Sequence, residues 1–167
     1  MHAGPVIVGF DGTPAAEETV REAAVLLGPR AALIVVVWEA GRSFEVATLP
    51  ERALDAPATL DIRGAFEAEE AAYQDAQRMA EHGAALARQA GLKAEGLAVA
   101  DDLTVADTLV RLAREVDAPA VAVGGHRHHG LSKLVHGSTL DGLLREAPCP
   151  VVVCGGARGG PDRPGSG

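Results

Sequence analysis

Five short apolar runs alternate with helical patterns along the 167 residues of this chain, and this alternation constrains the fold more than any other feature. The runs, rich in Val, Ile, Leu and Ala, occupy residues 5–10, 32–37, 94–99, 118–123 and 150–153. Continuous apolar runs of this length are typical of strands buried on both faces of a parallel sheet. The βαβαβαβαβ order favours right-handed crossovers. We therefore predict an α/β fold with an open, doubly wound, five-stranded parallel sheet of the Rossmann-like class.

The helical segments carry start and stop signals. Thr13 directly precedes Pro14 and predicts an N-cap, and Gly28 predicts the end of that helix. Thr104 and Asp107 predict a capping box for a later helix. A longer, Ala-rich helix is expected from about 64 to 91, after an irregular connection over residues 40–61. The predicted buried stripes are Phe66, Tyr73, Ala76, Ala80 and Ala87 in the long helix and Val105, Leu109, Leu112 and Val116 in the next one.

Composition narrows the class of protein. Hydrophobic residues make up 47% of the chain but aromatic residues only 3%, so the core must consist mainly of Ala, Val and Leu. We expect one domain over residues 1–154 and a disordered tail over 155–167. A net charge of −8 argues against non-specific nucleic-acid binding. The longest apolar run is too short to span a bilayer, and the first residues lack a signal-peptide pattern. We predict a cytoplasmic protein without membrane contact, in which Cys149 and Cys154 are reduced thiols.

A glycine-rich, basic segment follows the fourth predicted strand. Gly124 and Gly125 end that strand, and Gly137 precedes Ser138, the predicted N-cap of a helix that extends to about residue 147. No acidic residue lies between positions 117 and 141, although the protein as a whole is acidic. Glycines allow backbone N–H groups to approach a ligand, and a helix N-terminus adds unpaired donors. The segment therefore predicts an anion site, most often one for phosphate.

The predicted topology brings a second element to this segment. Asp11 follows the first strand and Gly124 follows the fourth. Ligands of open parallel sheets bind beyond the carboxyl ends of the strands, where the strand order reverses. If the first and fourth strands are neighbours, as in the order 3-2-1-4-5, Asp11, Gly124 and the helix that starts near Gly137 converge on one crevice.

Three separated segments resemble the universal stress protein family, over nearly all of the chain up to Cys154. The ATP-binding signature of that family is Gly, two residues, Gly, nine residues, Gly, then Ser or Thr. Gly124, Gly137 and Ser138 fall on this register. Residues 6–13 resemble the first strand and loop of the family, and residues 147–153 resemble its closing strand.

The resemblance implies the sheet order 3-2-1-4-5 of the adenine nucleotide alpha hydrolase-like fold and a site for ATP or another adenine nucleotide. In the family the aspartate at the position of Asp11 contacts the ribose or base, and Val37 and Val123 match residues that line the adenine pocket. The predicted nucleotide-binding residues are Gly9, Phe10, Asp11, Val37, Val123, Gly124, Gly125, Arg127, Gly137, Ser138 and Thr139.

The resemblance also implies a stress-responsive regulator that acts as a homodimer, and not a fast enzyme. The two copies are expected to pair through the last predicted strand, since an exposed strand edge needs cover. That strand consists of Pro150, Val151, Val152 and Val153.

Arg127 departs from the family signature, because it stands where the second glycine is expected. If the backbone there has a positive φ, a non-glycine residue costs roughly 1–2 kcal/mol, and its side chain obstructs the approach of phosphate. Alternatively, the guanidinium binds phosphate in a forked geometry. The first outcome favours a dimeric interaction module that has lost nucleotide binding, and the second favours a nucleotide sensor.

An enzyme is the remaining alternative. A slow ATPase would use Asp11 or Asp101 with Mg²⁺. Asp101 and Asp102 together could coordinate Mg²⁺, but such a pair is better suited to cap or precede the next helix. The chain has no P-loop and no evident pair of nucleophile and base, so we predict no catalytic residue. The loop histidines His126, His128 and His129 lack the cysteine or carboxylate partners of most zinc sites. Trp38 has two interpretations, stacking on a base or packing at the rim of the sheet.

Overall fold

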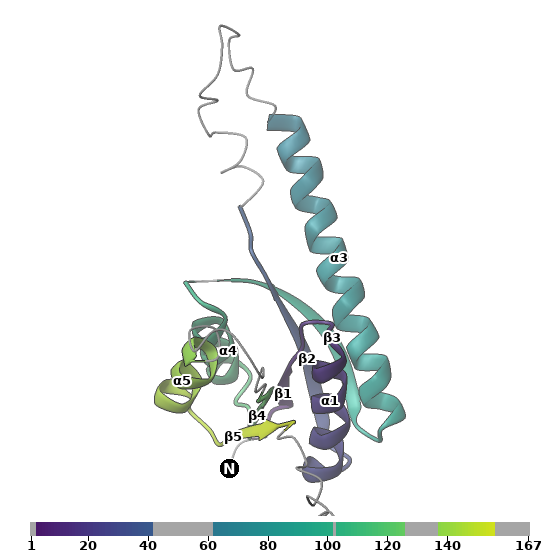
Figure 1. Ribbon diagram of the computed structural model, residues 1–167, viewed down its shortest axis with the longest axis vertical. Helices are drawn as coiled ribbons and strands as arrows, with labels where there is room; N and C mark the ends of the chain where they lie inside the picture. The colour runs from purple at the N-terminus through teal and green to yellow at the C-terminus, as the bar shows by residue number, and fades with distance from the viewer. Residues whose placement is uncertain (1–2, 42–61, 102, 126–136, 156–167) are drawn as a thin grey trace, which may run out of the picture.

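The computed structural model describes residues 3–41, 62–101, 103–125 and 137–155. Five parallel strands form one sheet in the order β3-β2-β1-β4-β5 (Figure 1). They are β1 (Val6–Gly9), β2 (Ala31–Trp38), β3 (Lys93–Ala100), β4 (Val121–Gly124) and β5 (Val151–Cys154). The predicted fold class and strand order are confirmed. Residues 42–61 of the predicted connection, and the predicted tail beyond Gly155, lie outside the described residues.

Four helices cover the two faces of the sheet in the described part of the chain (Figure 1). They are α1 (Pro14–Leu27), α3 (Ile62–Gln89), α4 (Val105–Glu115) and α5 (Gly137–Glu146). Alternate residues of β1 separate the core into two clusters, because successive side chains of a strand point to opposite faces. Val6 and Val8 pack with α1 and α3, and Ile7 packs with α4 and α5.

The predicted caps are largely present. Thr13 accepts a hydrogen bond from the Ala16 N–H at 3.2 Å, and Thr104 accepts one from the Asp107 N–H at 3.1 Å. Each bond satisfies a donor that the first turn of a helix otherwise leaves unpaired. The predicted N-cap at Ser138 is displaced: α5 begins at Gly137, so Ser138 is already the second residue of the helix.

The long helix α3 lies very close to β3. Ala76, Ala80 and Ala87 of the predicted stripe are buried. A Cβ atom added to Gly96 of β3 would lie only 2.5 Å from the backbone carbonyl carbon of Ala80. A glycine in the strand and an alanine in the helix therefore bring the two backbones into direct contact.

Parts of the predicted stripes are wrong. Phe66 is 62% exposed and Tyr73 is 42% exposed. The 28 residues of α3 extend for about 42 Å, whereas the eight residues of β2 extend for about 27 Å. The first turns of the helix therefore pass beyond the sheet, as Figure 1 shows, and Tyr73 contacts only the end of β2, at Trp38. Val105 is also 41% exposed, because it is the first residue of α4.

The two edges of the sheet differ. On the outer edge of β3, Gln77 donates to the Gly96 carbonyl and accepts from the Ala98 N–H, and Arg88 donates to the Ala94 carbonyl. Side chains of α3 therefore cover this edge. On β5, the other edge strand, Val153 is 46% exposed.

Two smaller expectations concern membranes and thiols. Among the described residues, no helix has both the length and the apolar character needed to cross a bilayer. Cys149 is half-buried, Cys154 is buried, and both are free cysteines.

The contact between Gly96 and Ala80 leads to a stability prediction. Gly96→Ala should lower the free energy of unfolding by about 1–3 kcal/mol, because the added methyl group must push α3 away from β3. Urea denaturation measures the effect. Glu95→Ala, at the exposed neighbouring position, should change stability by less than about 0.5 kcal/mol. Equal stability of the two variants would contradict the close packing.

Candidate functional site

The strands of the sheet end at different heights. β1 pairs with β2 only as far as Gly9 opposite Val35, and β4 ends at Gly124. β2 continues to Trp38, where it still pairs with Ala100 of β3. The carboxyl end of the sheet therefore has a notch, with β1 and β4 as its floor and the last residues of β2 as one wall.

A cavity of about 790 Å³ occupies this notch. Its lining comes from the ends of three strands, from the loop after β1, and from all four helices of the described chain. The strand and loop residues are Gly9, Phe10, Asp11, Val35, Val36, Val37, Trp38, Val123 and Gly124. The helix residues are Ala16, Ala72, Asp75, Ala76, Met79, Val105, Leu109, Thr139 and Leu140.

Most of the predicted site residues with described surroundings meet at this cavity. They are Gly9, Phe10, Asp11, Val37, Val123, Gly124 and Thr139. Gly137 and Ser138 form the start of α5, directly before Thr139. Arg127 lies outside the described residues, as do the three loop histidines.

Gly125 has a different environment from the one expected. Its N–H donates to the Cys154 carbonyl at 2.6 Å, so the sheet uses this amide. A Cβ atom at Gly125 would lie 2.6 Å from Cγ1 of Val153. Close packing against β5 is therefore sufficient to explain a glycine at this position.

Asp11 has a structural contact as well as a place at the cavity. Its Oδ1 accepts hydrogen bonds from the Thr13 N–H at 3.0 Å and from the Thr13 hydroxyl at 2.6 Å. These bonds hold the cap of α1 in place. The carboxylate is exposed and lines the cavity. Both interpretations of Asp11, as a loop cap and as a site residue, agree with this geometry.

The backbone of Val37 faces the notch. The Phe10 N–H donates to the Val35 carbonyl at 2.9 Å, and the Asp101 N–H donates to the Trp38 carbonyl at 2.9 Å. Peptide groups of alternate strand residues point to the same edge, so those of Val37 point toward β1, as those of Val35 do. Because β1 has ended at this level, the Val37 N–H and C=O are directed at the cavity.

Trp38 both packs and lines the cavity. Its ring lies 5.9 Å from the ring of Tyr73, with an angle of 56° between their planes. This tilted arrangement is favourable for two aromatic rings. The rim-packing interpretation is thus supported, while the same indole remains at the cavity wall.

The sequence did not indicate the contribution of α3. Ala72, Asp75, Ala76 and Met79 are spaced as one helical face, but only Ala76 was part of the predicted stripe. Met79 contacts the loop after β1, since a Cβ atom at Gly12 would lie 3.0 Å from its sulfur. The spacing shows that these four residues share one face of α3. It does not show that the helix docks with this face toward the cavity.

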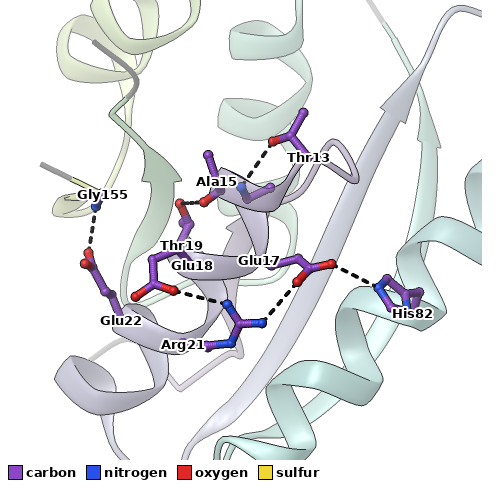
Figure 2. A network of polar contacts seen from close by, with 10 residues as sticks. Thr13, Ala15, Glu17, Glu18, Thr19, Arg21, Glu22, His82 and Gly155 are labelled. Carbon is purple, nitrogen blue, oxygen red and sulfur yellow. Dashed lines mark hydrogen bonds and ion pairs between the residues drawn. The ribbon is translucent and has the colours of Figure 1, made fainter. Parts of the chain in front are cut away.

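A polar network on α1 reaches α3 through His82 (Figure 2). Arg21 contacts Glu18 at 3.1 Å and Glu17 at 3.0 Å, and Glu17 lies 3.5 Å from His82 of α3. The hydrogen bonds to Glu18 and Glu17 raise the pKa of Arg21. The His82 ring also packs against Phe10, with centroids 6.3 Å apart. His82 of α3 therefore contacts both α1, through Glu17, and the loop after β1, through Phe10.

The residues considered for metal binding or thiol chemistry do not form a second reactive site in the described part of the chain. Asp101 does not line the cavity; its Oδ1 accepts from the Ala40 N–H at 3.2 Å. Asp102 lies outside the described residues, and in the described part of the chain no three metal-binding side chains gather. Burial raises the pKa of Cys149, and burial together with Glu22 raises the pKa of Cys154. Neither thiol therefore has the depressed pKa of a reactive cysteine.

A family model described as the universal stress protein family matches residues 3–155. No functionally curated protein matches the chain.

Three solved structures illustrate the similarity of fold. A universal stress protein from Archaeoglobus fulgidus in complex with dAMP is 21% identical, with a TM-score of 0.55 over 93% of this chain and 100% of that one. The protein UspA from Lactobacillus plantarum is 19% identical, with a TM-score of 0.56 over 92% and 99%. A family protein from Arabidopsis thaliana with AMP bound is 14% identical, with a TM-score of 0.54 over 90% of each chain.

The contact between Trp38 and Tyr73 can be tested optically. Trp38 is the only tryptophan, so it alone reports tryptophan fluorescence. Tyr73→Ala should shift its emission to longer wavelength, because removal of the phenol ring exposes the indole to water. Gln74→Ala, at the next position of α3, should leave the spectrum unchanged. Identical spectra for the two variants would contradict the packing.

Proposed function

The chain belongs to the universal stress protein family, and from this membership and the geometry of the notch we propose that its cavity binds an adenine nucleotide. The protein then acts as a nucleotide-responsive regulator under stress. The observation that carries the proposal is the convergence of Asp11, the Val37 peptide groups and the start of α5 on one cavity.

The Val37 backbone suits adenine. An outward N–H and C=O on one residue pair with the N1 acceptor and the N6 amine donor of adenine. Guanine has an N1–H donor and an O6 acceptor at the corresponding positions. Its N1–H would therefore face the Val37 N–H, and its O6 would face the Val37 carbonyl. The side chains of Val37, Val123 and Leu109 supply an apolar surface for the ring.

The sugar and phosphate groups have partners at the other side of the notch. The Asp11 carboxylate accepts a hydrogen bond from a ribose hydroxyl. The first turn of α5, which contains Gly137, Ser138 and Thr139, offers unpaired N–H groups and the positive end of the helix dipole to phosphate. A phosphate contact by Arg127, and a role for Mg²⁺, stay predictions from the sequence.

Two relatives support the choice of ligand. The Archaeoglobus fulgidus protein is a complex with dAMP, and the Arabidopsis thaliana protein has AMP bound. Both ligands are adenine nucleotides. We propose that the physiological ligand is ATP or another adenine nucleotide.

We also propose a homodimer through the free edge of β5. The Pro150 and Cys154 carbonyls accept from β4, so the peptide groups of Val151 and Val153 point to the opposite edge. An exposed strand edge of this kind is a template for a second strand. The covered edge of β3 offers no equivalent template.

Nucleotide binding is tested first on the purified protein. Denaturation followed by mass spectrometry should release an adenine nucleotide, and titration calorimetry should give AMP an affinity at least tenfold higher than GMP. ATP followed for hours in the presence of Mg²⁺ should stay intact. Steady formation of ADP would instead identify a slow ATPase, and the absence of both bound nucleotide and measurable affinity would identify an interaction module.

Asp11 provides the matched variant. Asp11→Ala should weaken AMP binding at least tenfold, because a hydrogen bond to a charged group contributes about 1.5–3 kcal/mol. Asp11→Asn keeps an oxygen for Thr13 and should bind with intermediate affinity. Asp107→Ala removes the comparable aspartate at the start of α4 and should leave AMP binding unchanged. Equal effects at positions 11 and 107 would assign Asp11 to the helix cap alone.

The dimer is tested by size-exclusion chromatography with light scattering. Val153→Lys should raise the dimer dissociation constant at least tenfold, because it places a charge on the β5 edge. Leu144→Lys, at a residue of α5 that is 61% exposed, should have no such effect. A dimer that survives Val153→Lys unchanged would exclude β5 as the interface.

A further inference from the structure

The cavity is lined from both faces of the sheet, because residues of α1 and α3 on one face and of α4 and α5 on the other contribute to it. Val37 packs with the cluster of α4 and α5, whereas the next residue, Trp38, packs with the cluster of α1 and α3. The two side chains therefore line opposite halves of the cavity. A total of about 790 Å³ lies toward the upper end of the range for small-molecule pockets, roughly 300–1,000 Å³.

The half beside α3 has its own chemistry. Trp38, Met79, Ala72 and Ala76 give it an aromatic and aliphatic wall. Asp75 adds a carboxylate at its rim, and among the described lining residues there is no lysine, arginine or histidine. The face of an indole attracts cations, and a thioether packs well against aromatic rings.

The wall is held in place from several sides. Tyr73 packs on Trp38, and Met79 packs against Gly12 of the loop after β1. Asp75 contacts Arg78, three residues further along α3. This pair is on the surface, with side chains that are 70% and 68% exposed, and such pairs are weak. An incoming cation can therefore compete with Arg78 for the carboxylate.

From these features we propose that the α3 half of the cavity is a second binding site, selective for a small protonated arylalkylamine, that is, an aromatic ring with an ammonium group on a short alkyl chain. The ring of the ligand packs against Trp38 and Met79, and its ammonium group binds the Asp75 carboxylate. This site uses none of the residues assigned to the base, the ribose or the phosphate, so it does not depend on the proposed nucleotide binding.

The probe is 2-phenylethylamine, which is transparent where tryptophan is selectively excited. It should change Trp38 fluorescence saturably, and 2-phenylethanol, which has the same ring without the charge, should bind at least tenfold more weakly. Equal affinity of the two probes, or no saturable change with either, would overturn the proposal.

Variants of α3 locate the ammonium contact. Asp75→Asn should weaken 2-phenylethylamine binding at least fivefold and leave AMP binding unchanged. Glu70→Gln removes an acid from the same helix outside the cavity and should leave both affinities unchanged. Equal amine affinity in the two variants would overturn the role of Asp75.

Competition separates this site from the nucleotide site. Saturating AMP should leave the affinity for 2-phenylethylamine within about twofold, and displacement of the amine by AMP would mean that the cavity holds only one ligand. Loss of AMP binding with retained amine binding would refute the proposed function alone, and the reverse result would refute only the second site.

Discussion

The unequal length of neighbouring strands is the constraint on which the rest of this structure depends. β1 and β4 end at Gly9 and Gly124, whereas β2 pairs with β3 as far as Trp38. Strands of equal length would have filled the space with backbone hydrogen bonds. Because β1 stops early, the Val37 peptide groups lose a strand partner and gain a cavity, and both faces of the sheet open into the same space.

Small residues make the arrangement of α3 possible. Ala80 lies against Gly96, and a Cβ atom at Gly83 would lie 2.8 Å from Cγ2 of Ile34. This close approach brings the Gln77 and Arg88 side chains to the outer edge of β3. It also directs Asp75 and Met79 toward the notch. The scarcity of aromatic residues in the chain fits such packing, since bulky side chains would separate the helix from the sheet.

Local chemistry made much of the fold predictable. The strand runs and the caps at Thr13 and Thr104 depend on short-range patterns, and these predictions are confirmed. Phe66 and Tyr73 continue the apolar pattern of α3, but no local signal reveals that the sheet ends near Tyr73 and short of Phe66. Asp75 and Met79 reach the cavity through the docking of α3, a tertiary property. Gly125 looked like a ligand contact, yet its amide is bonded to β5.

The Gln77 amide has a consequence for assembly. By occupying both the Gly96 carbonyl and the Ala98 N–H, it blocks two backbone groups that a further strand would need at the β3 edge. Strand addition is therefore favoured at the β5 edge instead. In the proposed homodimer, two molecules that pair through β5 would each use up this edge, so the pair would be closed by symmetry. In that proposal, one glutamine disfavours larger assemblies from the opposite edge of the sheet.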